Sequence, residues 1–175
     1  MGDHGIADQR TMSDDHLGIA EDTIAEDTIA VSVPARADTL PIVRSVVEHA
    51  LFAADWVFDD VVDVKLAVDE VCSQLVAGAS DWAPRLHLAI DIDGADFWCA
   101  IETVVDPRFT IDTTGFGWRV VEAVTDARSV SYSERGAPVV YEGAARQSLV
   151  DGDATSGAQA ARTVRVRIAK RGSVE

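Results

Sequence analysis

Glu70 and Gln74 are the pair of side chains whose types and spacing could do chemistry in this sequence. They lie four residues apart inside a helical pattern, so both project from the same side of a helix, beside its main apolar stripe. A carboxylate can accept a proton, and an amide oxygen one turn away can bind a hard cation such as Mg²⁺, which prefers oxygen ligands. The alternative interpretation is a plain solvated pair on the surface of a helix.

Two glycines, Gly115 and Gly117, flank Phe116 at the start of another helical pattern. Without Cβ atoms, the backbone N–H groups of such a segment can approach a phosphate, and the helix N-terminus adds positive potential. Two glycines before a helix are weak support when taken alone. Arg119 could either meet a phosphate or balance Glu122 on the surface.

The other residue types that catalyse reactions or bind metals are scattered. The four histidines have no companions at metal-ligand spacing, so we expect neither a metal cluster nor a nucleophilic triad. Cys72 lies in a helical pattern and Cys99 in a strand pattern, where each is typical of a small buried hydrophobe in a reducing compartment. The four tryptophans are expected to pack in the core or under loops.

An interleaved series of strand and helix patterns must position these residues. Asp38 is expected to cap the first helix, which has Pro41 in its first turn, and Asp59 or Asp60 the second. The order favours an α+β fold, a two-layer sandwich with helices on one face of a mixed, mostly antiparallel sheet. In chain order we expect a strand at 29–33, helices over 40–50 and from 59 or 60 to about 78, a hairpin of strands 86–92 and 97–101, a helix after 117, and strands at 130–132, 139–142 and 164–168.

Composition and charge narrow the classes of function. The chain of 175 residues has 15 Lys+Arg against 30 Asp+Glu, a net charge of -15, which disfavours direct binding to nucleic acid and favours either simple solubility or a basic protein partner. Residues 1–28 carry eight acidic side chains against Arg10 and a five-residue duplication, so we expect a disordered acidic tail. No targeting segment or membrane span is visible, so we expect a cytoplasmic chain. The folded domain is placed at 29–169, with a flexible loop at 144–162 and a C-terminal tail at 170–175.

The run Lys65-Leu66-Ala67-Val68-Asp69-Glu70-Val71-Cys72, together with the order of elements, resembles the anti-sigma serine kinases of the GHKL ATPase superfamily. It is particularly similar to the actinobacterial anti-sigma F type, and the resemblance covers about residues 29–169. It implies a sandwich that binds ATP and Mg²⁺ between one helix and a lid. By position, Glu70 matches the carboxylate that activates the attacking hydroxyl in this family, and Gln74 stands where the family has an Mg²⁺-binding Asn.

Three further positions carry over from the resemblance. Asp106 matches the acidic residue that contacts adenine, and Gly115 and Gly117 match the second glycine box. Two departures weaken this pattern, because Gln74 is one methylene longer than Asn and Pro107 and Arg108 replace the glycines after the adenine contact. The resemblance therefore predicts weak or absent catalysis.

Three functional hypotheses follow. The first is an anti-sigma factor that sequesters an alternative sigma factor in a stress or sporulation type of response and is released by a STAS-type anti-anti-sigma protein, as the resemblance implies. The second is an active serine/threonine kinase that phosphorylates that antagonist. The third is a domain that shares only the scaffold. The family also implies a homodimer, for which the first strand offers an edge.

Overall fold

Five strands form one sheet in the described residues, 28–80, 84–133 and 162–173 of this computed structural model. The order is β1-β2-β3-β5-β4, and every neighbouring pair of strands is antiparallel. β1 and β4 are therefore the edges of the sheet. The strand bounds are β1 (Ile29–Pro34), β2 (Arg85–Asp93), β3 (Asp96–Val105), β4 (Ala127–Ser133) and β5 (Arg162–Arg171).

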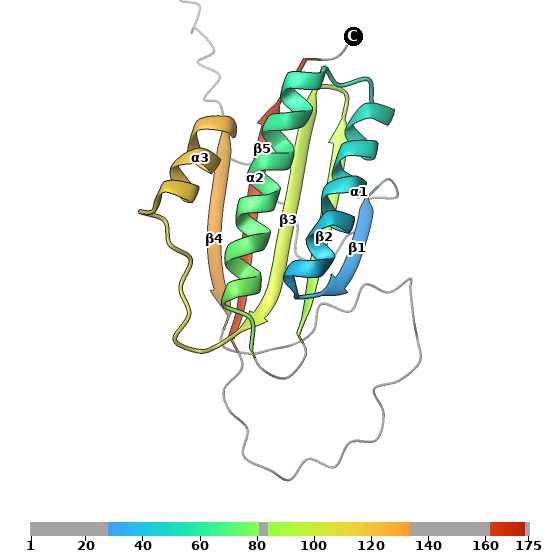
Figure 1. The fold of residues 1–175 in the computed structure, drawn as a ribbon. Helices are drawn as coiled ribbons and strands as arrows, with labels where there is room; N and C mark the ends of the chain where they lie inside the picture. The colour runs from blue at the N-terminus through green and yellow to red at the C-terminus, as the bar shows by residue number, and fades with distance from the viewer. Residues whose placement is uncertain (1–27, 81–83, 134–161, 174–175) are drawn as a thin grey trace, which may run out of the picture.

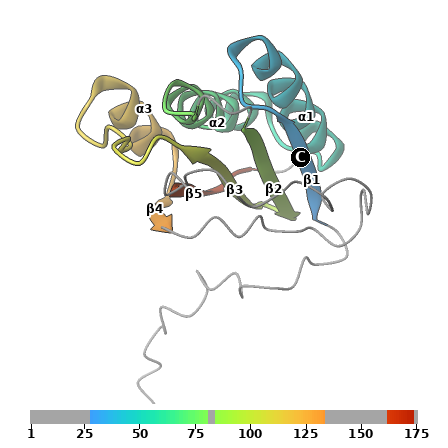
Figure 2. The same ribbon diagram turned by 90° about the horizontal axis from the view of Figure 1, so that it is seen from below.

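Three α-helices cover one face of this sheet, as Figure 1 and Figure 2 show. They are α1 (Leu40–Ala53), α2 (Phe58–Ala77) and α3 (Phe116–Val124), and a short 3-10 turn, η2 (Ala37–Thr39), precedes α1. This arrangement confirms the predicted α+β two-layer sandwich. Among the described helices, none combines the length and the apolar composition that a membrane span requires.

The core lies between α2 and the middle of the sheet. Apolar residues of α2 step by three and four, which places them on one stripe that faces the strands. Alternate residues of each strand point to the same side, as the period of a strand requires. The buried stripe comprises Val61, Val64, Val68, Val71 and Leu75, and the strands supply Leu86, Leu88, Ile90, Phe97, Ile101, Val164, Val166 and Ile168. Cys72 and Cys99 are buried as expected, and burial raises the pKa of both thiols.

Trp56 ties the turn between α1 and α2 to the β2–β3 hairpin. Its ring is 3% exposed and lies edge-on to Phe97, with ring centroids 6.2 Å apart. Its Nε1–H donates to the carbonyl oxygen of Gly94 over 2.9 Å. Gly94 has a φ of 54°, the left-handed conformation that favours glycine, and so permits the tight predicted turn between the two strands.

Three local features differ from the sequence prediction. Neither Asp59 nor Asp60 caps α2: both lie in its first turn, after the N-cap residue Val57. Asp38 does not cap α1: it lies inside η2 and pairs with Arg36, and the Thr39 hydroxyl that follows donates to the carbonyl of Pro34 over 2.7 Å. The chain thus reaches α1 through a tight turn from β1, which leaves no place for an aspartate cap.

β5 begins at Arg162 and continues to Arg171, so it includes residues assigned above to the loop and to the tail. The acidic tail up to residue 27, the strand predicted at 139–142 and most of the 144–162 loop lie outside the described residues.

A pair of identical substitutions on α2 tests which side of this helix holds the fold together. Leu75 is 0% exposed and Leu66 is 47% exposed. We expect Leu75→Ala to lower the free energy of unfolding by about 2–5 kcal/mol, because it leaves a cavity in the core. Leu66→Ala should change it by less than about 1 kcal/mol. Urea unfolding followed by circular dichroism measures both; equal losses would contradict the assigned packing.

Candidate functional site

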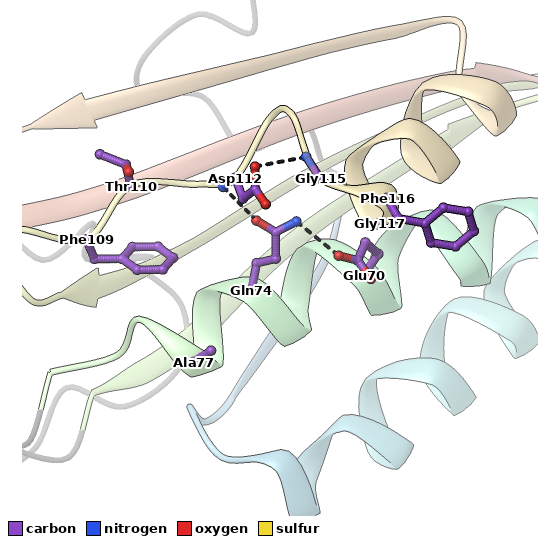
Figure 3. Close-up of a pocket in the computed structure, with 9 residues that line it drawn as sticks. All are labelled: Glu70, Gln74, Ala77, Phe109, Thr110, Asp112, Gly115, Phe116 and Gly117. Atoms are coloured by element: carbon purple, nitrogen blue, oxygen red, sulfur yellow. Dashed lines mark hydrogen bonds between the residues drawn. The ribbon is translucent and has the colours of Figure 1, made fainter.

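An open cleft of about 280 Å³ lies between α2 and the segment that leads into α3. It brings together four of the residues singled out from the sequence: Glu70, Gln74, Gly115 and Gly117. Figure 3 shows the side chains of Glu70 and Gln74 on α2 facing the segment that contains Gly115 and Gly117. The full lining is Glu70, Gln74, Ala77, Phe109, Thr110, Asp112, Gly115, Phe116 and Gly117.

Gln74 links α2 to the segment before α3. Its side-chain Nε2–H donates to Glu70 Oε1 over 3.0 Å, and its Oε1 accepts the backbone N–H of Asp112 over 2.9 Å. Both ends of the amide are therefore engaged within the protein (Figure 3). In this geometry Gln74 acts as a tether between two elements.

Asp112 closes the turn that opens α3. Its Oδ1 accepts the backbone N–H of Thr114 over 3.0 Å, the Thr114 hydroxyl over 2.9 Å and the backbone N–H of Gly115 over 2.9 Å. Hydrogen bonds from Thr114 and then Gly115 to the charged carboxylate lower the pKa of Asp112. Sequence reasoning missed this residue, although an aspartate that accepts backbone N–H groups two and three residues further on is a common turn signal.

Gly117 allows α3 to dock closely on α2. A Cβ atom at this position would lie 1.9 Å from Glu70 Oε1, so the carboxylate of Glu70 packs against the bare backbone of Gly117. The negative charge then sits beside the N-terminus of α3, where the helix dipole favours it. The glycine thus leaves room for the Glu70 carboxylate.

Asp106 and Arg119 lie apart from the lining of this cleft. Asp106 follows β3, where its Oδ1 accepts the backbone N–H of Arg108 over 2.8 Å and its own N–H donates to the carbonyl of Gly78 over 3.0 Å. The Phe109 ring lies so close to Gly78 that a Cβ there would be 2.3 Å from it. An aromatic ring of the chain itself therefore covers the C-terminal end of α2.

The arrangement does not fit a magnesium triphosphate. The ionisable side chains that line the cleft, Glu70 and Asp112, are both acidic, and the Gly115 N–H already has an internal acceptor. Among residues 28–80, 84–133 and 162–173, no cluster of three or more His, Cys, Asp or Glu side chains could hold a metal ion.

Comparison with known proteins finds a similarity to an anti-sigma factor over part of the chain. No family model matches the sequence. The chain is 31% identical over 98 residues to the anti-sigma-F factor RsbW of two Mycobacterium tuberculosis strains, CDC 1551 and H37Rv. The match includes 56% of this chain and 58% of each relative, so the chain spans less than two thirds of the length of the relatives it matches.

A double-mutant cycle tests the close approach of Glu70 to Gly117. Gly117→Ala should gain about 1 kcal/mol of helix propensity but must displace the Glu70 carboxylate and break its bond to Gln74, which costs about as much. We expect a nearly neutral effect in the natural background. In a Glu70→Ala background, the same change should raise the free energy of unfolding by about 1 kcal/mol. Identical effects in both backgrounds would contradict the contact.

The charge of Asp112 should make α3 docking depend on pH. The pKa of this carboxyl is lowered from its ordinary value of 3.8, so its contribution to stability is complete above that pH and is lost as the pH falls through the lower folded-state pKa. We expect Asp112→Asn to be less stable than the natural chain at neutral pH, and the difference to shrink in strong acid. Urea unfolding across a pH series measures it; a difference independent of pH would show that charge plays no part.

Proposed function

We propose that this chain is an anti-sigma factor that binds an alternative sigma factor and so represses transcription in the cytoplasm. The observation that carries this proposal is the 31% identity over 98 residues to an anti-sigma-F factor. The regulator of the proposed complex would be a STAS-type anti-anti-sigma protein, which competes for the same chain. The acidic composition supports a protein partner, because a net charge of -15 attracts a basic protein and repels nucleic acid.

The cleft supports binding as the activity, ahead of phosphoryl transfer. Phosphoryl transfer depends on positioning and on neutralising charge around the phosphates. Here Gln74 and the Gly115 N–H are engaged with Glu70 and Asp112, and the cleft presents two carboxylates. We therefore propose that Glu70, Gln74 and Asp112 hold α3 in place, and that the chain acts without turning over ATP.

The assembly state belongs to the same proposal. Among the described residues, β1 is an edge strand, and a second copy could extend the sheet by pairing with its outer backbone groups. A symmetric dimer of this kind would still leave the helical layer of each copy accessible, because β1 and α2 lie on different parts of the molecule (Figure 2). Analytical ultracentrifugation of the purified chain measures the assembly state.

Binding of purified sigma factors tests the proposed function. Each alternative sigma factor of the source organism would be titrated into the chain by isothermal titration calorimetry, with and without Mg-ATP. We expect one of them to bind with an affinity that Mg-ATP leaves unchanged within about twofold, because the cleft does not suit the nucleotide. The matched variant is Glu70→Gln, which keeps the size of the side chain and tests whether any effect of Mg-ATP depends on this carboxylate.

Two outcomes would contradict this proposal in different ways. Phosphorylation of a purified STAS protein that requires Mg-ATP and is lost in Glu70→Gln would establish the kinase activity instead. If no sigma factor binds, the relation to the anti-sigma factors would be one of scaffold alone.

A further inference from the structure

Three apolar side chains lie exposed along the outer surface of α2. Phe58, Val62 and Leu66 are 65%, 42% and 47% exposed, and they are spaced by four residues. Residues at this spacing form one continuous row, which runs obliquely across the surface of a helix. The row is separate from the buried stripe that faces the sheet, so the core does not explain it.

Side chains from the two neighbouring helices extend this row at each end. Phe52 of α1 stacks on Phe58, with ring centroids 6.5 Å apart and 18° between the planes. Phe116 of α3 is 82% exposed and lines the cleft with Glu70, which follows Leu66 by one turn. Figure 3 shows the Phe116 ring beyond Glu70, turned away from the rest of the cleft. We call Phe52, Phe58, Val62, Leu66 and Phe116 the outer ridge.

Unneutralised acidic side chains flank the outer ridge. Other charges on the outer surface of α1 and α2 are paired, Lys65 with Glu48 over 2.8 Å and Arg44 with Asp69 over 2.6 Å. In the part of the chain that the structure describes, Asp55, Asp59 and Glu70 form no ion pair. Asp55 and Asp59 are exposed beside the Phe58 end of the ridge, and Glu70 lies at the other end. The surroundings of the ridge are therefore negative.

We propose that the outer ridge is the surface that binds the sigma factor, and that its occupant is a basic amphipathic helix of that protein. This inference rests on the proposed function. A row of exposed apolar side chains with an acidic border suits a helix that has one apolar face and basic flanks. A sigma factor carries basic surfaces because it must neutralise DNA phosphates, so its charge is complementary. Binding at the ridge would then cover groups that otherwise contact DNA.

Single charge insertions test the ridge against a matched control. Leu66→Asp and Val62→Asp each place a charge in the middle of the row. The control is Ile42→Asp, because Ile42 is 53% exposed on α1. Arg44 of α1 contacts Asp69 of α2, and Ile42 precedes Arg44 by two residues, which is a rotation of about 200° around the helix. The Ile42 side chain therefore points away from α2. We expect each ridge variant to weaken binding of the sigma factor by about tenfold or more. Ile42→Asp should stay within about twofold of the natural chain, with circular dichroism and urea unfolding confirming that all three variants fold.

A charge-neutral variant tests the acidic border separately. Asp59→Asn should weaken binding by a fewfold and make it less sensitive to added salt, because it removes one attraction to a basic partner. Calorimetric titrations at two salt concentrations measure this effect. An unchanged salt dependence would contradict the assigned charge of the partner.

The same titrations separate failure of the ridge from failure of the proposed function. If the natural chain binds a sigma factor and both ridge variants bind it equally well, the ridge is not the binding surface, but the proposed anti-sigma function is supported. If the natural chain binds no sigma factor, both the proposed function and the proposed occupant of the ridge are wrong. If Leu66→Asp instead dissociates a homodimer in sedimentation and leaves sigma binding intact, the occupant is a second copy of the chain and the proposal is wrong.

Discussion

The structure depends on the packing of α2 against the middle of the sheet. Its buried side chains, from Val61 to Leu75, contact the alternate apolar residues of the central strands, and each such side chain stabilises the fold by about 1.5–3 kcal/mol. α1 and α3 lie on either side of α2 and limit the part of it that remains accessible (Figure 2). The large apolar side chains that α2 leaves exposed fall on one oblique row of its outer surface. Phe58, Val62, Leu66, Glu70 and Gln74 are the successive members of that row.

The two halves of this row differ in how their side chains are satisfied. Glu70 and Gln74 make hydrogen bonds or close contacts with α3 and the segment before it, so their polar groups already have partners in the folded chain. Phe58, Val62 and Leu66 leave much of their apolar surface in water, which is costly unless another molecule covers it. The row thus has a structural polar half and an unsatisfied apolar half. This contrast supports a binding protein, in which Glu70 and Gln74 hold α3 against α2.

Much of the fold followed from periodicity, and the misses have local causes. The three-and-four spacing in α2 and the two-residue alternation in β2, β3 and β5 are strong signals, because each element buries one regular face. The predicted Asp38 cap of α1 was wrong because a 3-10 turn joins β1 to α1 and the Thr39 hydroxyl stabilises it. The sequence pattern does not reveal this turn. Spacing did place Glu70 and Gln74 on one side of a helix. The hydrogen bond from the Asp112 N–H to Gln74 and the contact of Glu70 with Gly117 arise between segments far apart in the sequence, so spacing could not predict them. The outer ridge was not predicted for the same reason, because its residues come from three helices.

Hydrogen–deuterium exchange of the chain, with and without the cognate sigma factor, would test the central claim most directly. The measurement reports where the backbone becomes protected when the partner binds. Binding through the outer ridge predicts new protection over residues 52–70 and around Phe116, with little change in β1 or β2. Protection confined to the β1 edge or to the sheet, with α2 unaffected, would contradict it.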